Sequence, residues 1–181
     1  MTKINLIITL ISLFTWSCNN KENKAELATS TKSEKVVAIS SPCELISIED
    51  VKNIFSVTEF SIEMQDKVLT HPTCIYKWKD GKVFSMKKIG NQEVEIKMPS
   101  EVLIVMVKEA NKNSYNRSIK VYKQPQEISN LGDMAVWDAK MSQLSFLANN
   151  YLFHVHVKVS NEEQNNRKKA IEVSNLIIEK N

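Results

Sequence analysis

The sequence predicts an α+β fold: an antiparallel sheet with a short N-terminal helix, a middle helix and a C-terminal helix packed on it. Three observations lead to this prediction. Apolar residues recur at helical spacing near both ends of the folded part. Several segments between them alternate apolar and polar residues, as strands do. The resulting order of helix, strands, helix, strands, helix is typical of the α+β class.

The first helix is expected from Ile48 to Phe55. Ser47 is a good N-cap and Asp50 stands at the third helical position, which together predict a capping box. The apolar positions of this segment fall on one face at helical spacing, so they are expected to be core residues.

Strands are expected after this helix. The run 73–79 alternates and ends at Asp80-Gly81, a pair that favours a tight turn, and 82–88 looks extended again, so a hairpin is predicted with its turn at 80–81. Residues 93–98 alternate weakly. The run 102–107 is continuously apolar, which predicts a central strand buried on both faces.

The second half repeats the pattern of a helix followed by strands. A polar stretch at 111–123 has aromatic and apolar residues at helical spacing and is followed by Pro125, which ends the predicted helix. Strands are expected at 135–138, 143–148 and 151–159. A final helix is expected, capped by Ser160 with Glu163 at the third position, and facing the sheet with Ala170, Val173, Ser174, Ile177 and Ile178.

Composition argues against some functions. The chain has 181 residues, and its 24 basic and 21 acidic residues give a formal charge of +3. The length suits one domain. Because the basic residues are scattered and the net charge is small, no nucleic-acid partner is predicted.

The amino terminus predicts export. A short positive start is followed by the apolar run 6–14, which is too short for a membrane-spanning helix and is typical of a signal peptide. Ser17 precedes Cys18 and polar residues follow, as in bacterial lipoproteins, although Thr15 and Trp16 depart from the usual signal. We therefore expect a signal peptide at 1–17, a lipidated Cys18 with a flexible tether at 18–40, and one domain at 41–181.

The cysteine count supports this interpretation. The chain has three cysteines, and lipidation of Cys18 would account for the odd one. Cys43 and Cys74 could then pair in an oxidising envelope, and two buried thiols that never meet are the alternative. No Cys-x-x-Cys spacing points to a redox-active pair.

Three segments carry a resemblance to a known family. They are Pro42-Cys43-Glu44-Leu45, the run Cys74-Ile75-Tyr76, and Leu131-Gly132-Asp133-Met134-Ala135-Val136-Trp137. Their order and spacing resemble a family of uncharacterised bacterial lipoproteins that contain a domain of unknown function. The resemblance implies a disulfide between Cys43 and Cys74 and an anchored location in the cell envelope. It implies no activity and no catalytic residue.

Few residues suggest chemistry. His154 and His156 share one face of a predicted strand and are weak candidates for a metal site, because no local spacing supplies further ligands. Gly132 is expected to supply a turn and Asp133 to hydrogen-bond the local backbone, with a ligand role as the alternative. Trp137 is expected in the core or at a sheet edge, with ligand stacking as the alternative.

The functional hypothesis follows from these observations. No catalytic or cofactor-binding motif is found, so no enzyme and no cofactor are predicted. We expect a lipid-anchored protein of the bacterial cell envelope, facing the periplasm or the exterior, that binds an envelope protein or a small molecule. The alternatives are a small hydrolase or metal-binding protein that uses the face of His154 and His156, and a passive structural or stress-related component.

Overall fold

The structure is a computed structural model that describes residues 38–181. The predicted signal peptide, the lipidation site at Cys18 and the predicted tether as far as residue 37 lie outside the described residues.

The described chain contains seven strands, three α-helices and two short 3-10 helices. In chain order they are η1 (Pro42–Glu44), α1 (Ile48–Phe55), β1 (Glu63–Val68), β2 (Pro72–Ile89), β3 (Gln92–Val107), α2 (Lys112–Ser118), η2 (Ile119–Val121), β4 (Pro125–Glu127), β5 (Met134–Asp138), β6 (Gln143–Ala148), β7 (Tyr151–Lys158) and α3 (Glu163–Lys180).

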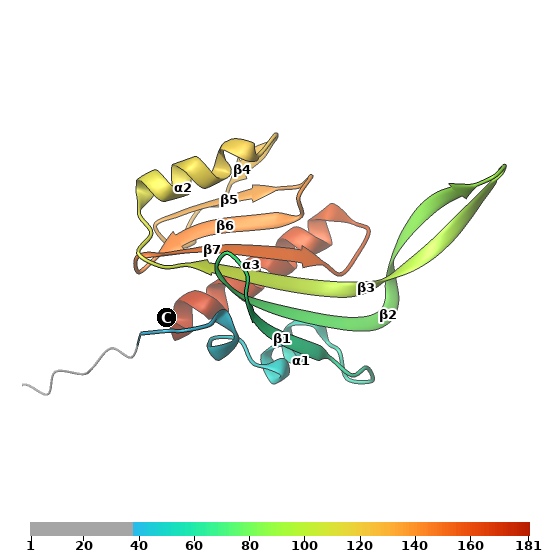
Figure 1. The fold of residues 1–181 in the computed structure, drawn as a ribbon, viewed down its shortest axis with the longest axis horizontal. Coiled ribbons are helices and arrows are strands. Elements are labelled where there is room, and N and C mark those ends of the chain that lie inside the picture. Colours follow the sequence, from blue (N-terminus) through green and yellow to red (C-terminus); the bar gives the residue numbers. More distant parts are fainter. Residues whose placement is uncertain (1–37) are drawn as a thin grey trace, which may run out of the picture. The chain divides into compact units, whose positions relative to one another are not determined.

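All seven strands form one sheet in the order β1-β2-β3-β7-β6-β5-β4 (Figure 1). Every neighbouring pair is antiparallel. The predicted α+β class with an antiparallel sheet is therefore confirmed. The sheet consists of two meanders, β1 to β3 and β4 to β7, which meet where β3 pairs with β7.

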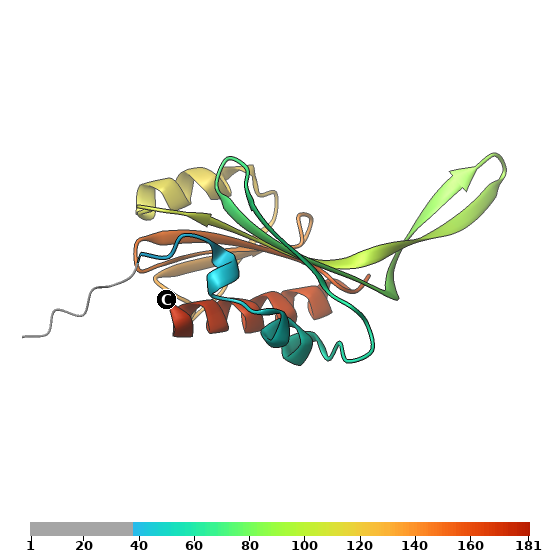
Figure 2. The ribbon, with the colours of Figure 1, turned by 60° about the horizontal axis from the view of Figure 1, so that its bottom comes forward.

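Helices lie on both faces of the sheet (Figure 2). On one face α3 contacts β6 and β7, and α1 contacts α3. The larger apolar core lies here, and its fully buried side chains include Tyr76, Ile104, Trp137 and Phe153. On the other face α2 and η2 cover a smaller core that contains Tyr115, Tyr122 and Leu152.

The first helix has the predicted bounds and cap. The Ser47 side chain accepts from the Asp50 amide at 3.1 Å, and the Asp50 carboxylate accepts from the Ser47 amide at 2.7 Å, so the capping box is confirmed. Val51 and Phe55 are buried, as the apolar periodicity predicted.

The predicted turn at Asp80-Gly81 is wrong. The chain passes through these residues inside β2, and the hairpin turns ten residues later, between Ile89 and Gln92. Gly81 still uses its positive φ of 73°, but in a bulge where pairing shifts between Trp78 and Val83. Pro99 lies opposite this bulge, where its missing amide donor breaks no ladder bond.

The long β2–β3 hairpin therefore has two parts. Its root pairs Thr73–Trp78 with Ser100–Val105, and β1 and β7 flank this part. Beyond the bulge, 83–89 pairs with 92–98 alone, because β1 pairing ends at Lys77 and β7 pairing begins at Glu101. We call this second part the arm. Figure 1 shows it extending away from the rest of the sheet.

Two further predictions need correction. The run 102–107 lies between two strands, as predicted, but only its even-numbered side chains are fully buried and Leu103 and Val105 are half-buried. The last helix begins after Glu162, so Ser160 is not its N-cap. The Ser160 hydroxyl instead accepts from the Glu162 amide at 3.0 Å, and the Asn166 side chain accepts from the amides of Val159 and Ser160.

The middle helix is confirmed in place but is shorter than predicted. It is an α-helix of seven residues, capped by Asn111, that continues as the 3-10 helix η2. Strands β1 and β4 were not anticipated, because both are exposed edge strands with little apolar alternation.

Candidate functional site

The two histidines of β7 lie on the sheet face that carries α2, as the alternation predicted. His154 is half-buried, and its Nδ1 lies 2.6 Å from the Ser145 hydroxyl oxygen. The Ser145 hydroxyl also hydrogen-bonds the hydroxyl of Tyr122, to which Gln143 Nε2 donates at 2.6 Å. These four side chains form a network that joins η2 to the sheet.

The electrostatics of this network keep it neutral. Burial, with a smaller contribution from His71, lowers the pKa of His154 to about 4. Burial also raises the pKa of Tyr122. At neutral pH, His154 is an uncharged ring and Tyr122 an intact phenol, so both act as hydrogen-bonding groups.

His156 has a different set of neighbours. Its Nδ1 lies 2.8 Å from the Met141 carbonyl oxygen, which makes Nδ1 the protonated nitrogen. Its Nε2 lies 4.0 Å from Glu101 Oε1, and the other carboxylate oxygen of Glu101, Oε2, lies 2.8 Å from Lys77 Nζ. The face therefore carries the Lys77–Glu101 ion pair beside the neutral network.

The geometry of the histidine face does not favour metal binding or nucleophilic catalysis. Within residues 38–181, no three His, Cys, Asp or Glu side chains gather into a metal-binding group. Ser145 lies within hydrogen-bond reach of His154, as a nucleophile and its base would. However, Ser145 is 0% exposed and its hydroxyl already bonds two neighbours, so a substrate has no path to it.

Gly132 meets a steric requirement. Its φ is +58°, and a Cβ added there would lie 2.4 Å from the Leu147 carbonyl oxygen. Only glycine fits such a position. The backbone at Gly132 therefore lies close to β6, which supports the predicted role of Gly132 in a turn.

Asp133 and Trp137 lie in different environments, one at the surface and the other in the core. The Asp133 backbone amide donates to the Leu147 carbonyl at 2.8 Å, while its exposed carboxylate has no hydrogen-bond partner among the described residues. Trp137 is 0% exposed in the larger core, and its indole N–H donates to a Glu163 carboxylate oxygen of α3 at 2.5 Å. The structure thus places Trp137 in the core, and leaves Asp133 at the surface.

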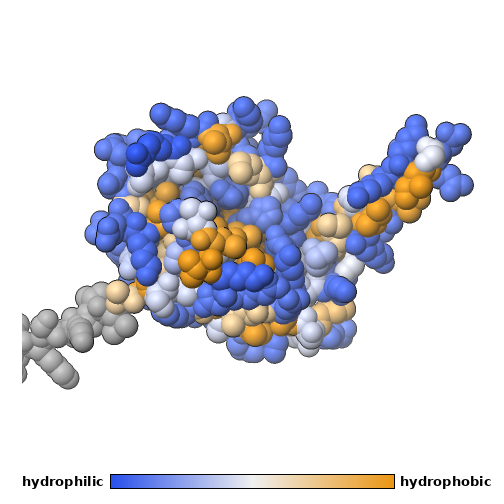
Figure 3. Space-filling view, in the orientation of Figure 1, coloured by the Kyte–Doolittle hydropathy of each residue, from blue (hydrophilic) through white to orange (hydrophobic). Residues whose placement is uncertain are grey.

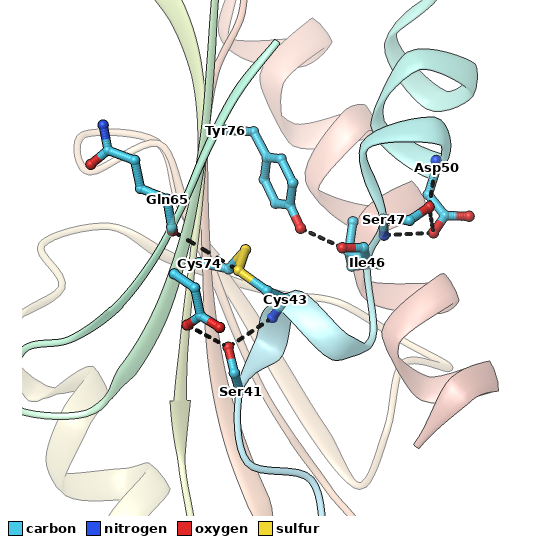
Figure 4. The surroundings of a disulfide bond; sticks show 9 residues. Ser41, Cys43, Ile46, Ser47, Asp50, Gln65, Cys74 and Tyr76 are labelled. Carbon is cyan, nitrogen blue, oxygen red and sulfur yellow. Dashed lines mark hydrogen bonds between the residues drawn. A yellow bond between two sulfur atoms is a disulfide. The ribbon is translucent and has the colours of Figure 1, made fainter.

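The two cysteines of the domain form a disulfide. Cys43 of η1 and Cys74 of β2 are joined with a Cα–Cα distance of 5.2 Å (Figure 4). The surrounding hydrogen bonds hold the same segment: the Ser41 hydroxyl donates to Asp66 at 2.7 Å, and the Tyr76 hydroxyl donates to the Ile46 carbonyl. The segment that precedes α1 is thereby fixed to β1 and β2.

The base of the arm is also fixed. The Asp80 carboxylate accepts from Trp78 Nε1 at 2.9 Å, from the Ser100 hydroxyl at 2.8 Å and from the Lys82 amide at 3.2 Å. Although burial opposes ionisation, these donors and the Lys82 charge lower the pKa of Asp80 below its usual value. The bulge is thus organised around a buried carboxylate.

A second contact holds the first residues of the arm. The Asn161 side chain accepts from the Phe84 amide at 3.2 Å and donates to the Phe84 carbonyl at 3.1 Å, as a neighbouring strand would. The arm therefore leaves the sheet in a defined direction.

Apolar side chains are exposed on both faces of the arm. One face carries Phe84 and Met86, 38% and 54% exposed. The register places the others together on the opposite face, where Ile89, Val94 and Met98 are 61%, 38% and 41% exposed and Ile96 is half-buried. Figure 3 shows hydrophobic surface running along the arm.

Sequence reasoning missed the arm because it assigned the turn to the wrong residues. The dipeptide Gly90-Asn91 between two extended runs is itself a hairpin signal, and Gly90 has a φ of 61°. Nothing in the alternation of 83–98 distinguishes a strand covered by a helix from one that is not.

Comparison with protein-family models, with curated proteins and with solved structures finds no match to the chain. Within residues 38–181 no helix has both the length and the hydropathy needed to cross a membrane.

Proposed function

We propose that this chain is a lipid-anchored protein of the bacterial cell envelope whose domain binds another envelope protein through the arm. The proposed anchor is an acylated Cys18, the residue that directly follows the predicted signal peptide 1–17. Domains of this size that lack a catalytic constellation commonly act in recognition.

The observation that carries the proposal is the combination of exposed apolar surface and a rigid base. A two-stranded hairpin alone is only marginally stable in water. In this arm the Asp80 network and the Asn161 contact fix the first residues and Val83 is buried, while residues 86–95 are all exposed. Contiguous exposed apolar surface on a soluble domain commonly marks an interaction site.

The charges of the arm indicate what kind of protein surface it fits. Five lysines are exposed along the bulge and the arm, at 79, 82, 87, 88 and 97. The exposed acids are Glu93 and Glu95, since the Asp80 carboxylate bonds internally. The arm is therefore amphipathic and basic, and it suits an apolar partner surface bordered by carboxylates.

The free edges add a second binding mode. An extended segment of the partner could add a strand to the outer edge of 92–98, or to the outer edge of 83–89 beyond Phe84, whose backbone Asn161 already bonds. Backbone hydrogen bonds would supply affinity, and the apolar side chains of the arm would select the partner sequence.

Site-specific photo-crosslinking in the native host tests the arm. A photoreactive residue at Val94 is expected to give one discrete product with a different protein. The same residue at Val121, which is 61% exposed on η2, should give none. Lys87→Glu with Lys88→Glu should abolish the Val94 product. A product with the mass of two copies, or equal products from both positions, would contradict the proposal.

Mass spectrometry tests the anchor independently. Intact protein from the native membrane fraction is expected to begin at Cys18, to carry an acyl mass, and to gain two hydrogens on reduction of the Cys43–Cys74 bond. A soluble species without acyl mass would refute the lipoprotein assignment while leaving the arm experiment valid.

A further inference from the structure

The most exposed large apolar side chains of the described chain lie where β1 turns into β2. Val68 is 79% exposed and the adjacent Leu69 is 65% exposed. We call residues 67–71 the tip. Neither of the two side chains belongs to either apolar core, so the packing of the fold does not account for them. Adjacent apolar residues at a turn, where polar residues are usual, indicate a contact outside the domain.

The tip and α2 rise from the same side of the sheet, opposite to α3 (Figure 2). On this side the register places Leu103 and Val105 of β3 beside His156 and His154 of β7. Leu103 and Val105 are half-buried and belong to neither core. Figure 3, which views this face, shows apolar surface at its centre. The apolar surface is therefore larger than the tip alone.

The same face carries positive charge without a partner. Residues 110–124, which include α2 and η2, contain basic residues and no acidic one. The tip adds Lys67, which pairs with Thr73 in the row that continues through Val105 to His154. None of these cations forms a salt bridge within residues 38–181. The basic residues of 110–124, all exposed, are Lys112, Arg117, Lys120 and Lys123.

The acidic side chains of this face do not offset that charge. Glu63 and Glu101 lie in one row with Lys77 at the opposite end of the strands from the tip, and Glu101 pairs with Lys77. Lys108 and Glu109, which follow β3, offset each other. On the other face of the sheet, α1 and α3 carry acidic and basic residues in balance. The excess of positive charge is thus concentrated on the tip, α2 and η2.

The amino-terminal chain enters the domain beside the tip. The Ser41 hydroxyl donates to Asp66 at 2.7 Å, and Cys43 is bonded to Cys74. Asp66 and Cys74 pair directly, and Val68 lies about 7 Å further along β1. The arm leaves from the other end of β2. A lipid attached to the chain before this point would therefore hold the tip, rather than the arm, near a membrane.

We propose that the tip, with the basic surface of α2 and η2, docks on an anionic lipid membrane. Val68 and Leu69 enter the boundary between headgroups and acyl chains, and the lysines and Arg117 face the lipid phosphates. This docking rests on the proposed anchor at Cys18, because two apolar side chains and a few charges bind a membrane only weakly without a tether. Docking fixes one face of the domain to the membrane and leaves the arm at the other end of β2.

A fluorescent label beside the tip measures docking. The mature acylated protein carrying Thr70→Cys is reconstituted in vesicles of phosphatidylcholine and phosphatidylglycerol. Cys43 and Cys74 stay bonded, so the introduced thiol takes the label. Lipids with a nitroxide high in the acyl chain are expected to quench the label at position 70. Quenching should fall in phosphatidylcholine alone and in high salt. A label at Lys168→Cys, exposed on α3, should stay unquenched throughout.

One pair of variants tests the apolar contact. Val68→Thr with Leu69→Gln should lower the ratio of docked to undocked domain about tenfold or more, since two apolar side chains leave the lipid. Phe60→Gln is the matched control, because Phe60 is 42% exposed at the other end of β1. This control should leave the ratio unchanged.

A second pair of variants tests the charge. Lys112→Gln with Lys120→Gln should lower the same ratio about tenfold or more, because each lysine near an anionic surface contributes to binding. Lys52→Gln with Lys168→Gln removes the same charge from α1 and α3 and should leave the ratio unchanged. An unchanged melting temperature in each variant shows that the fold is intact.

Three results would overturn the docking: no quenching at position 70 in protein that floats with the vesicles, equal quenching at positions 70 and 168, or equal losses in the variants and their controls. The first result refutes docking alone and leaves the anchor intact. Protein that neither floats nor carries an acyl mass would refute the anchor and the docking together. The crosslinking experiment at Val94 is independent of all these results, since it probes the arm.

Discussion

The root and the arm of the β2–β3 hairpin are built from the same two strands, yet their surroundings differ completely. In the root, β1 and β7 flank the pair and η1 contacts both strands, and Tyr76 and Ile104 are 0% exposed in the larger core. In the arm Val83 beside the bulge is still buried, but residues 86–95 are all exposed, and Ile89 is 61% exposed. The difference shows that alternation produces a strand, whereas neighbouring elements decide whether its apolar residues stabilise the fold or remain available for binding.

Removal of the disulfide should have the largest effect on stability, and this effect should arise in the root. Because the bond closes a loop of 31 residues, its loss is expected to lower the free energy of unfolding by about 4 kcal/mol in the chain-entropy account. Cys43→Ala with Cys74→Ala would be measured by urea denaturation, with reduced wild type as the matched control. The rates of amide hydrogen exchange in the arm should rise only as far as the lower global free energy of unfolding requires. A loss below about 1 kcal/mol would contradict this account.

A matched pair of isoleucines on β3 tests the comparison directly. Ile104→Ala in the root creates a cavity in the core and should cost about 3 kcal/mol. Ile96→Ala in the arm should cost less than about 1 kcal/mol, since that side chain is only half-buried. Similar losses by urea denaturation would mean that the arm is part of the cooperative core.

Acid should weaken the root more than the arm. His154 faces Val105 across β7 and β3, and burial lowers its pKa to about 4 from an ordinary 6.5. The unfolded chain therefore binds the proton first, so stability falls as the pH drops from about 6.5 to 4, by about 2 to 3 kcal/mol in total.

Denaturation at several pH values would measure this loss. The variant His154→Gln should remove most of it, whereas His71→Gln should leave it nearly unchanged because His71 makes only the smaller contribution. If the free energy of unfolding fell with pH equally in His154→Gln and in wild type, other groups would cause the acid sensitivity.

The junction between root and arm should show the smallest and most local effect. Asp80→Ala leaves the Trp78 and Ser100 donors without their acceptor, at a cost of about 1 to 2 kcal/mol. Amides of the arm should then exchange faster than those of the root. Asn161→Ala should produce a weaker change confined to the Phe84 amide. If Asp80→Ala accelerated amide hydrogen exchange equally in the root and in the arm, Asp80 would stabilise the whole sheet rather than the junction.

Sequence patterns predicted most of the core of this fold. The α+β class, the first helix with its capping box, and the strands 143–148 and 151–159 were found because local periodicity and capping determine them. The turn was misplaced because Asp80-Gly81 serves equally well in a bulge, and local sequence does not separate the two uses. The start of α3 was misplaced because Asn166 reaches back to cap the preceding amides.

The candidate sites were less accessible to sequence reasoning. Gly132 and Asp133 were singled out, but their contacts with the Leu147 carbonyl depend on how the loop lies against β6. The histidines were found together, yet the network of His154 also needs Ser145 of β6 and Tyr122, which directly follows η2. Such groups depend on long-range pairing, which one sequence does not reveal.

The position of the disulfide also determines how the domain carries mechanical tension. A pull on the amino-terminal side of the domain, opposed at the carboxyl end, passes from Cys43 through the sulfur bridge to Cys74 in β2. Residues 44–73, which include α1 and β1, lie outside this covalent load path. The covalent bridge therefore delivers tension directly to an interior strand of the sheet, where many hydrogen bonds resist it together, and prevents α1 and β1 from being peeled away one after the other.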